Sequence, residues 1–233
     1  MKQFTRILNS IKTSTRVQRL LQKIEATDWM RFWGVFFFAL VSLNLSFHIL
    51  FEGRDLQEIF WFCNVMAVFL AYGFYYKKAS VVNATLIMSI PAQFLWIADF
   101  FLEAFGYGLG RTSLLVSDSA LYATVLISVT MHALIIPMSI WGSIKLGFSR
   151  FAYLWTLPIV GILLPATYLF TNPFENRNCV FFPCDLSYAT DYQELISEGY
   201  MTTSYFLQMQ LSWLLMFTAS FLVLYVLFWK KRI

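Results

Sequence analysis

Six long runs of apolar residues follow one another along this chain of 233 residues, separated by short polar segments. The runs are Trp29–Phe51, Ile59–Tyr76, Ser80–Leu102, Ala120–Gly142, Phe151–Phe170 and Tyr205–Trp229. Each has roughly 18–25 residues, the length that a helix needs to cross a hydrocarbon core of roughly 30 Å. The pattern therefore predicts an all-α fold, in which six transmembrane helices over residues 29–233 form one bundle.

The segment before the first run has a different pattern. Apolar residues recur there at helical spacing, with Lys and Arg between them: Phe4, Ile7, Leu8, Ile11, Val17, Leu20, Leu21 and Ile24. A helix of this kind lies on a membrane surface that carries anionic lipids. We expect residues 1–28 to form a cytoplasmic interfacial amphipathic helix; the alternative is a basic segment that only enforces topology. The segment lacks the continuous apolar stretch of a cleavable signal peptide.

Charged residues fall on opposite sides of such a bundle. Fourteen of the seventeen Lys and Arg residues lie on the side of the two termini, and eleven of the thirteen Asp and Glu lie on the other. Positively charged loops are typical of the cytoplasmic side. We therefore expect an integral membrane protein, located in a bacterial inner membrane, with both termini in the cytoplasm and residues 171–204 forming a long outer loop.

The composition agrees with a membrane location and excludes a soluble domain. Hydrophobic residues make up 59% of the chain and charged residues 13%, whereas soluble proteins have about 25% charged residues. The net charge of +4 comes from the biased loops and the N-terminal segment, so we expect no nucleic-acid partner. Membrane lipid is the expected partner, with a second copy of the chain or another membrane protein as a further one.

Several polar residues interrupt the apolar runs. Such residues are costly in lipid and normally face the bundle interior or a water-filled cavity, so each is a functional candidate. They recur at steps of three or four positions in the first, third and fourth runs: Asn44 and His48; Gln93, Trp96 and Asp99; Thr124, Ser128 and His132. The second run begins with Cys63 and Asn64. In the first, third and fourth runs, the steps of three or four positions place these residues on one face of each helix.

Structural roles are the alternative for most of these residues. Ser and Thr in membrane helices usually bond to their own backbone or to a neighbouring helix, which applies to Thr124 and Ser128. Asn and Gln serve equally well as contacts between helices, and a lone cysteine is usually a small apolar residue. His132 and Asp99 are harder to explain this way, because one lies deep and the other is an acid within an apolar run.

Depth along the runs separates two arrangements. His48 and Asp99 lie roughly 5 Å, and Cys63 roughly 6 Å, below the outer ends of their runs. A thiol, a base and a carboxylate in one layer are the parts of a nucleophilic site. His132 lies roughly 18 Å below the outer end of its run. A dyad of Cys63 with His132 therefore requires a tilted or bent helix.

Two short motifs carry a resemblance to a known family. Cys63 is followed by Asn64 at the start of the second run, and His132 lies five residues before Pro137. In this the chain resembles the androgen-induced and androgen-dependent intramembrane hydrolases and their cysteine acyltransferase relatives. The resemblance implies that Cys63 is the nucleophile and His132 the base, acting on a lipid ester.

A second resemblance involves three segments. The WxCN segment, the PAQxLWxxDF segment and the histidine of the fourth run are similar to those of uncharacterised bacterial membrane proteins with six spans. This similarity implies the same six-span fold but no activity.

These observations lead to one main functional hypothesis. We expect an intramembrane thiol-dependent hydrolase or acyltransferase, in which Cys63 attacks a lipid ester, His132 or His48 acts as base and Asp99 orients a histidine. The substrate pocket would be lined by Asn44, Asn64, Gln93 and Trp96. No cofactor and no metal ion are expected.

Two other functions stay open. The first is a transporter or channel for a small polar or cationic solute, with an outward-facing pocket in which Asp99, Gln93, His48 and His132 bind the solute or relay protons. The second is an assembly or scaffold subunit that uses the outer loop and the N-terminal helix as contact surfaces.

The outer loop contains two further cysteines. Cys179 and Cys184 are separated by four residues, which permits a disulfide in an oxidising compartment. The spacing is a poor zinc signature, because no histidine lies nearby. Acidic residues follow in the same loop, and we expect a solvated segment that covers the outer mouth of the bundle.

Overall fold

The computed structural model describes residues 28–51, 56–107, 122–173, 177–181 and 192–229. These residues form helices and turns, and no strand occurs among them. The predicted interfacial helix at the N-terminus lies in residues 1–27, outside this part of the chain, and stays a prediction.

Helices alternate with short 3₁₀ and π turns along the chain. The elements are α3 Trp29–Leu50, η1 Leu56–Phe60, α4 Phe62–Tyr75, α5 Ala79–Ala104, α7 Tyr122–Leu146, η2 Arg150–Trp155, η3 Ile159–Leu163, α8 Leu164–Phe170, η5 Arg177–Cys179, α9 Tyr192–Ser197 and α10 Thr203–Trp229.

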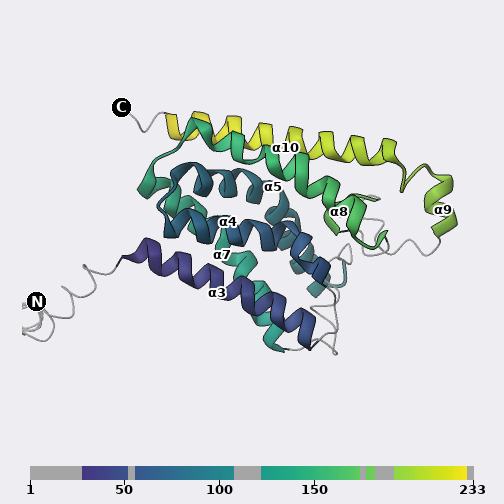
Figure 1. The fold of residues 1–233 in the computed structure, drawn as a ribbon, viewed down its shortest axis with the longest axis horizontal. Helices are drawn as coiled ribbons and strands as arrows, with labels where there is room; N and C mark the ends of the chain where they lie inside the picture. Colours follow the sequence, from purple (N-terminus) through teal and green to yellow (C-terminus); the bar gives the residue numbers. More distant parts are fainter. Residues whose placement is uncertain (1–27, 52–55, 108–121, 174–176, 182–191, 230–233) are drawn as a thin grey trace, which may run out of the picture.

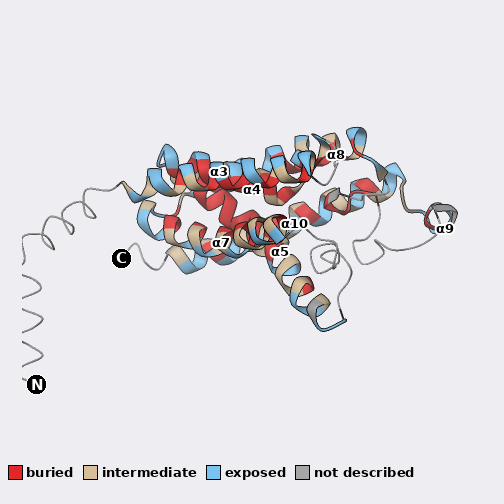
Figure 2. Cartoon of the chain, turned by 90° about the horizontal axis from the view of Figure 1, so that it is seen from below, coloured by how far each residue is buried: buried red, intermediate tan, exposed pale blue. Residues whose placement is uncertain are grey.

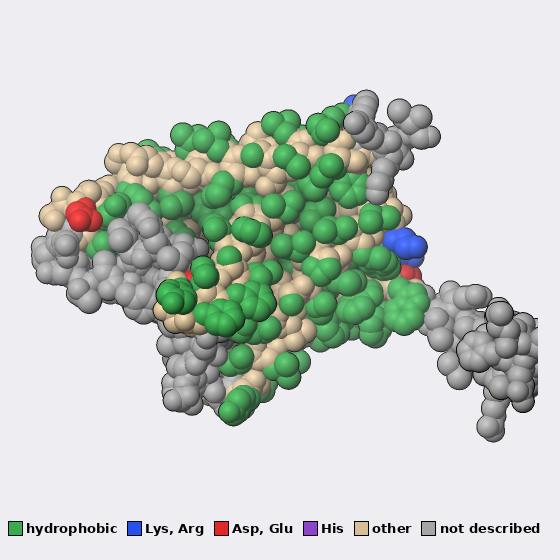
Figure 3. All heavy atoms as spheres, turned by 180° about the vertical axis from the view of Figure 1, so that it is seen from behind, with side chains coloured by type: hydrophobic (Ala, Val, Ile, Leu, Met, Phe, Trp, Pro, Cys, Tyr) green, Lys and Arg blue, Asp and Glu red, His purple; other side chains and the backbone are tan. Residues whose placement is uncertain are grey.

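The helices form an elongated bundle with two distinct ends (Figure 1). At one end α3 begins, α4 turns into α5, and α7 and α10 end; it holds Lys77, Lys78, Lys145 and Arg150 and is called the basic end below. The opposite end holds η1, η5 and α9 and is called the loop end. Exposed apolar side chains cover the surface between the two ends, as Figure 3 shows for one face.

Five segments are long and apolar enough to cross a membrane. They are Trp29–Leu50, Ala79–Glu103, Tyr122–Leu146, Arg150–Phe170 and Thr203–Phe228. They coincide closely with five of the six predicted runs, so the chain has the helices of a membrane protein.

The second predicted run does not form one long helix. Its helix α4 has 14 residues, which rise about 21 Å and fall short of a hydrocarbon core of roughly 30 Å. The residues before it form the 3₁₀ turn η1, in which Glu58 is buried. The count of six spanning helices is therefore not confirmed by helix length.

The fifth segment, Arg150–Phe170, changes helix type twice along its length. Pro158 and Pro165 lie within it. Proline has no N–H group and clashes with the carbonyl four residues earlier, so two prolines seven residues apart disturb the regular α-helical pattern. The segment accordingly passes from a 3₁₀ turn through the π turn η3 into α8.

Helix α5 lies at the centre of the bundle (Figures 1 and 2). Its residues 81–89 are all buried, and it packs against α4, α7, η2 and α10.

Small residues let helices approach closely, and α3 packs on α4 in this way. A Cβ atom on Gly34 of α3 would lie 2.8 Å from the backbone nitrogen of Tyr75 in α4.

An ion pair joins two elements at the basic end. The Oδ1 atom of Asp28 accepts a hydrogen bond from the backbone N–H of Arg31 and so caps α3. Its Oδ2 atom lies 2.9 Å from Nζ of Lys77, in the turn between α4 and α5. The hydrogen bond from Lys77 holds the pKa of the Asp28 carboxyl group below its usual range.

One residue of the outer loop joins several elements at the loop end. The side chain of Asn178 accepts a hydrogen bond from the Phe62 N–H at 3.0 Å and donates one to the Phe60 carbonyl at 2.7 Å. Its own carbonyl accepts a hydrogen bond from Nε1 of Trp213 in α10. Residues 178–181 are buried against the end of the bundle, while most of the acidic segment that follows lies outside the described residues, so its role as a cover stays a prediction.

Candidate functional site

Helices α5 and α7 pack side by side in an antiparallel register. Near the basic end, Nδ2 of Asn83 donates a hydrogen bond to Oγ of Ser143 at 2.7 Å. Further along, the rings of Trp96 and His132 stack with centroids 3.7 Å apart and planes 13° apart. Between these two contacts the chain advances thirteen residues along α5 and goes back eleven residues along α7. The two contacts therefore fix which residues of α5 and α7 lie side by side.

A series of buried polar side chains follows this pair of helices, and we call it the polar column. Its members share a face with Trp96 on α5 or with His132 on α7: Ser89, Gln93, Asp99, Thr124, Ser128, His132 and Ser139. All are at most 6% exposed. Since buried polar groups in a membrane are costly, the concentration of seven of them in one seam makes the polar column the candidate site.

Most of the unsatisfied polar atoms of the structure lie in the polar column. Four buried side-chain atoms have no hydrogen-bond partner among the described residues, and three of them are Gln93 Oε1, Thr124 Oγ1 and Ser139 Oγ. The fourth is Asn44 Oδ1 on α3. Leaving such a group unpaired costs about 1–3 kcal/mol. An unpaired group in a folded protein therefore calls for an explanation, such as a ligand that binds there.

The hydrogen bonds of His132 define the role of each ring nitrogen. Its Nδ1 atom lies 2.7 Å from the carbonyl oxygen of Ser128. Because a carbonyl only accepts, Nδ1 carries the proton, and in the neutral ring Nε2 is left as an acceptor. Trp96 stacks on the ring and itself stacks on Phe100. The imidazole is therefore held in one orientation.

Two prolines lie at the same level of the two helices. Pro91 is inside α5 and Pro137 is inside α7. Proline lacks the N–H group that would bond to the carbonyl four residues earlier, which here belongs to Ile87 and Ala133. Ala133 and Pro137 are exposed, so the carbonyl that Pro137 leaves unpaired lies on the outer surface of α7 and not in the polar column.

Asn83 closes the basic end of the polar column. It is fully buried; it donates to Ser143 and accepts from the backbone N–H of Ser149 at 2.6 Å. Ser143 in turn donates to the carbonyl of Ser139. Both polar atoms of the Asn83 side chain thus have a protein partner, in contrast to Oε1 of Gln93 further along the column.

A second polar group joins α3, α4 and η1. Asn44 Nδ2 donates to Asn64 Oδ1 at 3.1 Å, and Asn64 Nδ2 donates to the carbonyl of Glu58 at 2.7 Å. His48 is buried one turn along α3 from Asn44. The structure thus brings together the predicted residues Asn44 and Asn64, as a contact between helices.

Cys63 is not joined to a base in this structure. Its thiol is the free one among the described cysteines, and backbone N–H groups at the start of α4 act on it. The carboxylate of Glu58 acts on it electrostatically. His132 is bonded to Ser128 instead, while His48 and Asp99 are buried and have other interactions. The predicted roles of Cys63 as nucleophile and of a histidine as base stay predictions.

Asp99 and His132 lie closer in depth than the sequence predicts. Counting residues from the outer ends of their runs separates them by roughly 13 Å. Trp96 lies opposite His132, and Asp99 is only three residues further along α5, a rise of about 4.5 Å. The count assumed that all runs begin at one level, but the packing contacts between two helices decide their register.

Sequence reasoning missed two residues of the loop end. Glu58 is 3% exposed and Asn178 is 4% exposed, although both lie in segments predicted as solvated or at a span boundary. The position of Glu58 next to an apolar run was a signal that its side chain is buried. No local signal marked Asn178, because its partners lie far away in the chain.

The predicted disulfide is only partly within the described residues. Cys179 is buried, and Cys63 is the free cysteine of the described part. Cys184 lies outside it, so the pairing of the two loop cysteines stays a prediction. The residues that the structure describes contain no group of three or more His, Cys, Asp or Glu that could hold a metal ion.

The chain matches no family model, no curated protein and no solved structure. The family resemblances suggested by the sequence motifs therefore stay predictions, and the functional argument rests on the geometry of the site.

Proposed function

We propose that this protein is a transporter or channel that binds a small cationic or donor-rich solute in the polar column between α5 and α7. The observation that carries the proposal is that three of the four unsatisfied buried side-chain atoms lie in this one seam. A solute that donates hydrogen bonds to these oxygen atoms would remove the cost of leaving them unpaired.

The chemistry of the polar column favours a donor as the ligand. Gln93 offers Oε1, His132 offers Nε2, and Asp99 adds a carboxylate one turn towards the loop end. Ammonium and guanidinium groups, including protonated amines, are donors without acceptors and match such a lining. A proton relay would use the same acceptor atoms, and Nε2 of His132 would be one of them.

We further propose that the solute enters from the loop end. The basic end is closed by the bonds of Asn83, whereas Thr124 and Asp99 continue the column towards the loop end. An acidic entrance attracts cations and raises their local concentration.

We also propose that the chain crosses the membrane six times, although α4 by itself is too short to span it. The basic end carries Lys77, Lys78, Lys145 and Arg150, which is typical of a cytoplasmic face. Helix α4 with η1 then completes a sixth crossing, and both chain ends lie in the cytoplasm. The loop end faces outward, so that uptake into the cell begins there.

Reconstituted liposomes test the proposal with two probes, methylammonium and guanidinium, whose uptake is measured with and without protein. Gln93→Leu keeps the size of the side chain and removes its acceptor. Uptake should fall about tenfold, because one hydrogen bond of about 1.4 kcal/mol corresponds to that factor. Gln210→Leu is the matched control, since Gln210 donates to the carbonyl of Val160 outside the column.

Three results would speak against the proposal. They are equal uptake by protein-free and protein-containing liposomes, unchanged uptake in Gln93→Leu, or an equal loss in the two glutamine variants. The last result would show that a damaged fold, and not the polar column, is responsible.

A further inference from the structure

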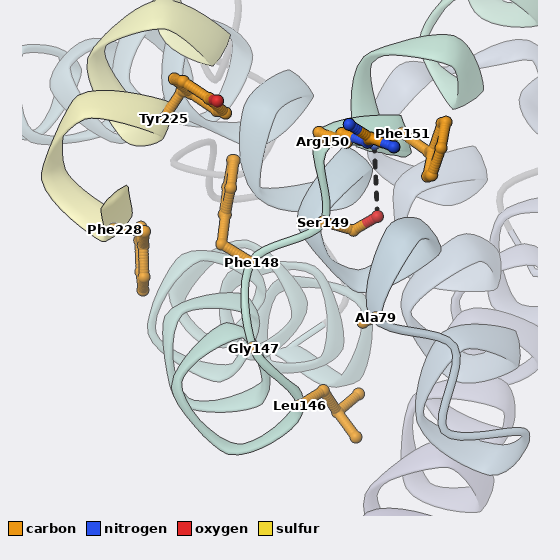
Figure 4. Close-up of a pocket in the computed structure, with 9 residues that line it drawn as sticks. All are labelled: Ala79, Leu146, Gly147, Phe148, Ser149, Arg150, Phe151, Tyr225 and Phe228. Carbon is orange, nitrogen blue, oxygen red and sulfur yellow. Dashed lines mark hydrogen bonds between the residues drawn. The ribbon is translucent and has the colours of Figure 1, made fainter. Parts of the chain in front are cut away.

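A cavity lies at the basic end of the bundle (Figure 4). Its volume is about 410 Å³, and it is lined by Ala79, Leu146, Gly147, Phe148, Ser149, Arg150, Phe151, Tyr225 and Phe228. These residues come from the start of α5, the end of α7, the segment that leads into η2, and the last turns of α10. The cavity is separate from the polar column, whose basic end is closed by Asn83.

The lining combines an apolar wall with one positive charge. The rings of Phe148 and Phe228 stack with centroids 5.1 Å apart. The guanidinium of Arg150 lies 4.9 Å above the centre of the Phe151 ring, and no carboxylate lines the cavity. A guanidinium that lies over a ring keeps the N–H groups at its edge available, and these match the oxygen atoms of a phosphate group.

The surroundings of the cavity are those of a lipid headgroup. Lys78 and Lys145 each lie next to a lining residue in the chain. Phe151 lines the cavity and is itself exposed on the apolar surface of the bundle. Basic pockets between membrane helices on the cytoplasmic side bind anionic headgroups. An exposed ring beside the cavity is suited to contact with an acyl chain.

We propose that this cavity binds the headgroup of an anionic phospholipid, with the phosphate on Arg150 and an acyl chain against the exposed ring of Phe151. Free inorganic phosphate shares the chemistry of the headgroup but makes no apolar contacts. The aromatic wall therefore points to the lipid as the occupant.

Native mass spectrometry of the full-length protein in detergent tests the site. Phosphatidylglycerol is the probe, phosphatidylcholine is the zwitterionic comparison, and inorganic phosphate is added as a competitor. Wild type should retain phosphatidylglycerol in preference to phosphatidylcholine, and an equal concentration of inorganic phosphate should not displace it. Arg150→Gln should weaken retention about tenfold, since a charge-assisted hydrogen bond is lost.

Lys145→Gln is the matched control for charge, because Lys145 is exposed at the same end but does not line the cavity. Its retention should stay within about threefold of wild type, as expected for a diffuse surface charge. Phe228→Ala keeps every charge and removes part of the wall, and it should also weaken retention of the lipid.

Four results would overturn the site. Equal losses in Arg150→Gln and Lys145→Gln would show diffuse attraction to the basic end. Equal retention of the two lipids would remove the role of the charge. Displacement of the lipid by inorganic phosphate would identify a free anion as the ligand. Unchanged retention in Phe228→Ala would place the lipid elsewhere.

Discussion

The indole of Trp96 lies flat against the imidazole of His132, with ring centroids 3.7 Å apart. The two residues are 36 positions apart in the chain, and their contact determines which residues of α5 and α7 share a level. It also covers one face of the His132 ring, whose Nδ1 atom lies 2.7 Å from the carbonyl oxygen of Ser128. The stack is therefore both a packing contact and a constraint on the polar column.

The Trp96–His132 stack should contribute measurably to stability. In a double-mutant cycle with Trp96→Leu and His132→Leu, we expect a coupling free energy of about 1 kcal/mol, which is typical of aromatic pairs. The free energy of unfolding in detergent is the measured quantity. A cycle of Trp96→Leu with Trp213→Leu is the control, and its coupling should stay below about 0.5 kcal/mol. Equal coupling in both cycles would contradict a specific stack.

Lys77 combines an ion pair with an unfavourable backbone conformation. Its φ is 53°, in a region where glycine is more stable than other residues. Lys77→Met removes the ion pair to Asp28 and keeps the strain, so it should destabilise the protein. Lys77→Gly removes both and should be more stable than Lys77→Met. Thermal unfolding in detergent would show the order of the two variants.

The same ion pair should give a dependence on pH. Lys77 lowers the pKa of Asp28 from its ordinary value of 3.8. The stabilisation is therefore complete above that value and is lost as the pH falls through the lower pKa of the folded state. The difference in stability between wild type and Lys77→Met should be present at about pH 7 and shrink at about pH 3. A difference that grows on acidification would exclude this role.

Gly34 should not tolerate a side chain. A Cβ atom there would lie 2.8 Å from the Tyr75 nitrogen and 2.9 Å from the Ala71 oxygen, and both are backbone atoms of α4. Gly34→Ala should therefore lower the free energy of unfolding by about 1–3 kcal/mol. Gly161→Ala is the control, since nothing lies within 4 Å of its added Cβ. Similar losses in both variants would refute the close packing of α3 on α4.

Asn178 should be the residue of the outer loop that is most sensitive to substitution. Its φ is 57°, and its side chain bonds to the backbone on both sides of the start of α4. Asn178→Gly keeps the backbone conformation and loses the bonds, at about 1–3 kcal/mol. Asn178→Ala adds backbone strain and should be less stable still. Limited proteolysis of the loop and thermal unfolding would measure the order; an alanine variant as stable as the glycine variant would disprove it.

Cys63 distinguishes the two main functional hypotheses. Its thiol is free and lies outside the polar column, so Cys63→Ala should leave uptake in liposomes within about twofold of wild type, because such a cysteine acts as a small apolar residue. Asp99→Asn should reduce uptake strongly. An electrophilic activity probe that labels Cys63, and loses the label in His132→Ala, would instead support the thiol enzyme.

The sequence by itself determined the membrane character of the protein and most helix bounds. The run Trp29–Phe51 corresponds to α3, which ends one residue earlier, because about 20 apolar residues in a row are stable only as a helix in lipid. Helical periodicity also placed Gln93, Trp96 and Asp99 on one face, since that relation depends only on spacing within one helix.

The tertiary structure alone decided what these residues contact. The pairing of Trp96 with His132, the burial of Glu58 in η1 and the bonds of Asn178 to the start of α4 all join segments that are distant in the chain or folded irregularly. Periodicity within one helix carries no information on the register between two helices, which is set by side-chain packing. The polar column therefore became visible only when α5 and α7 were placed side by side.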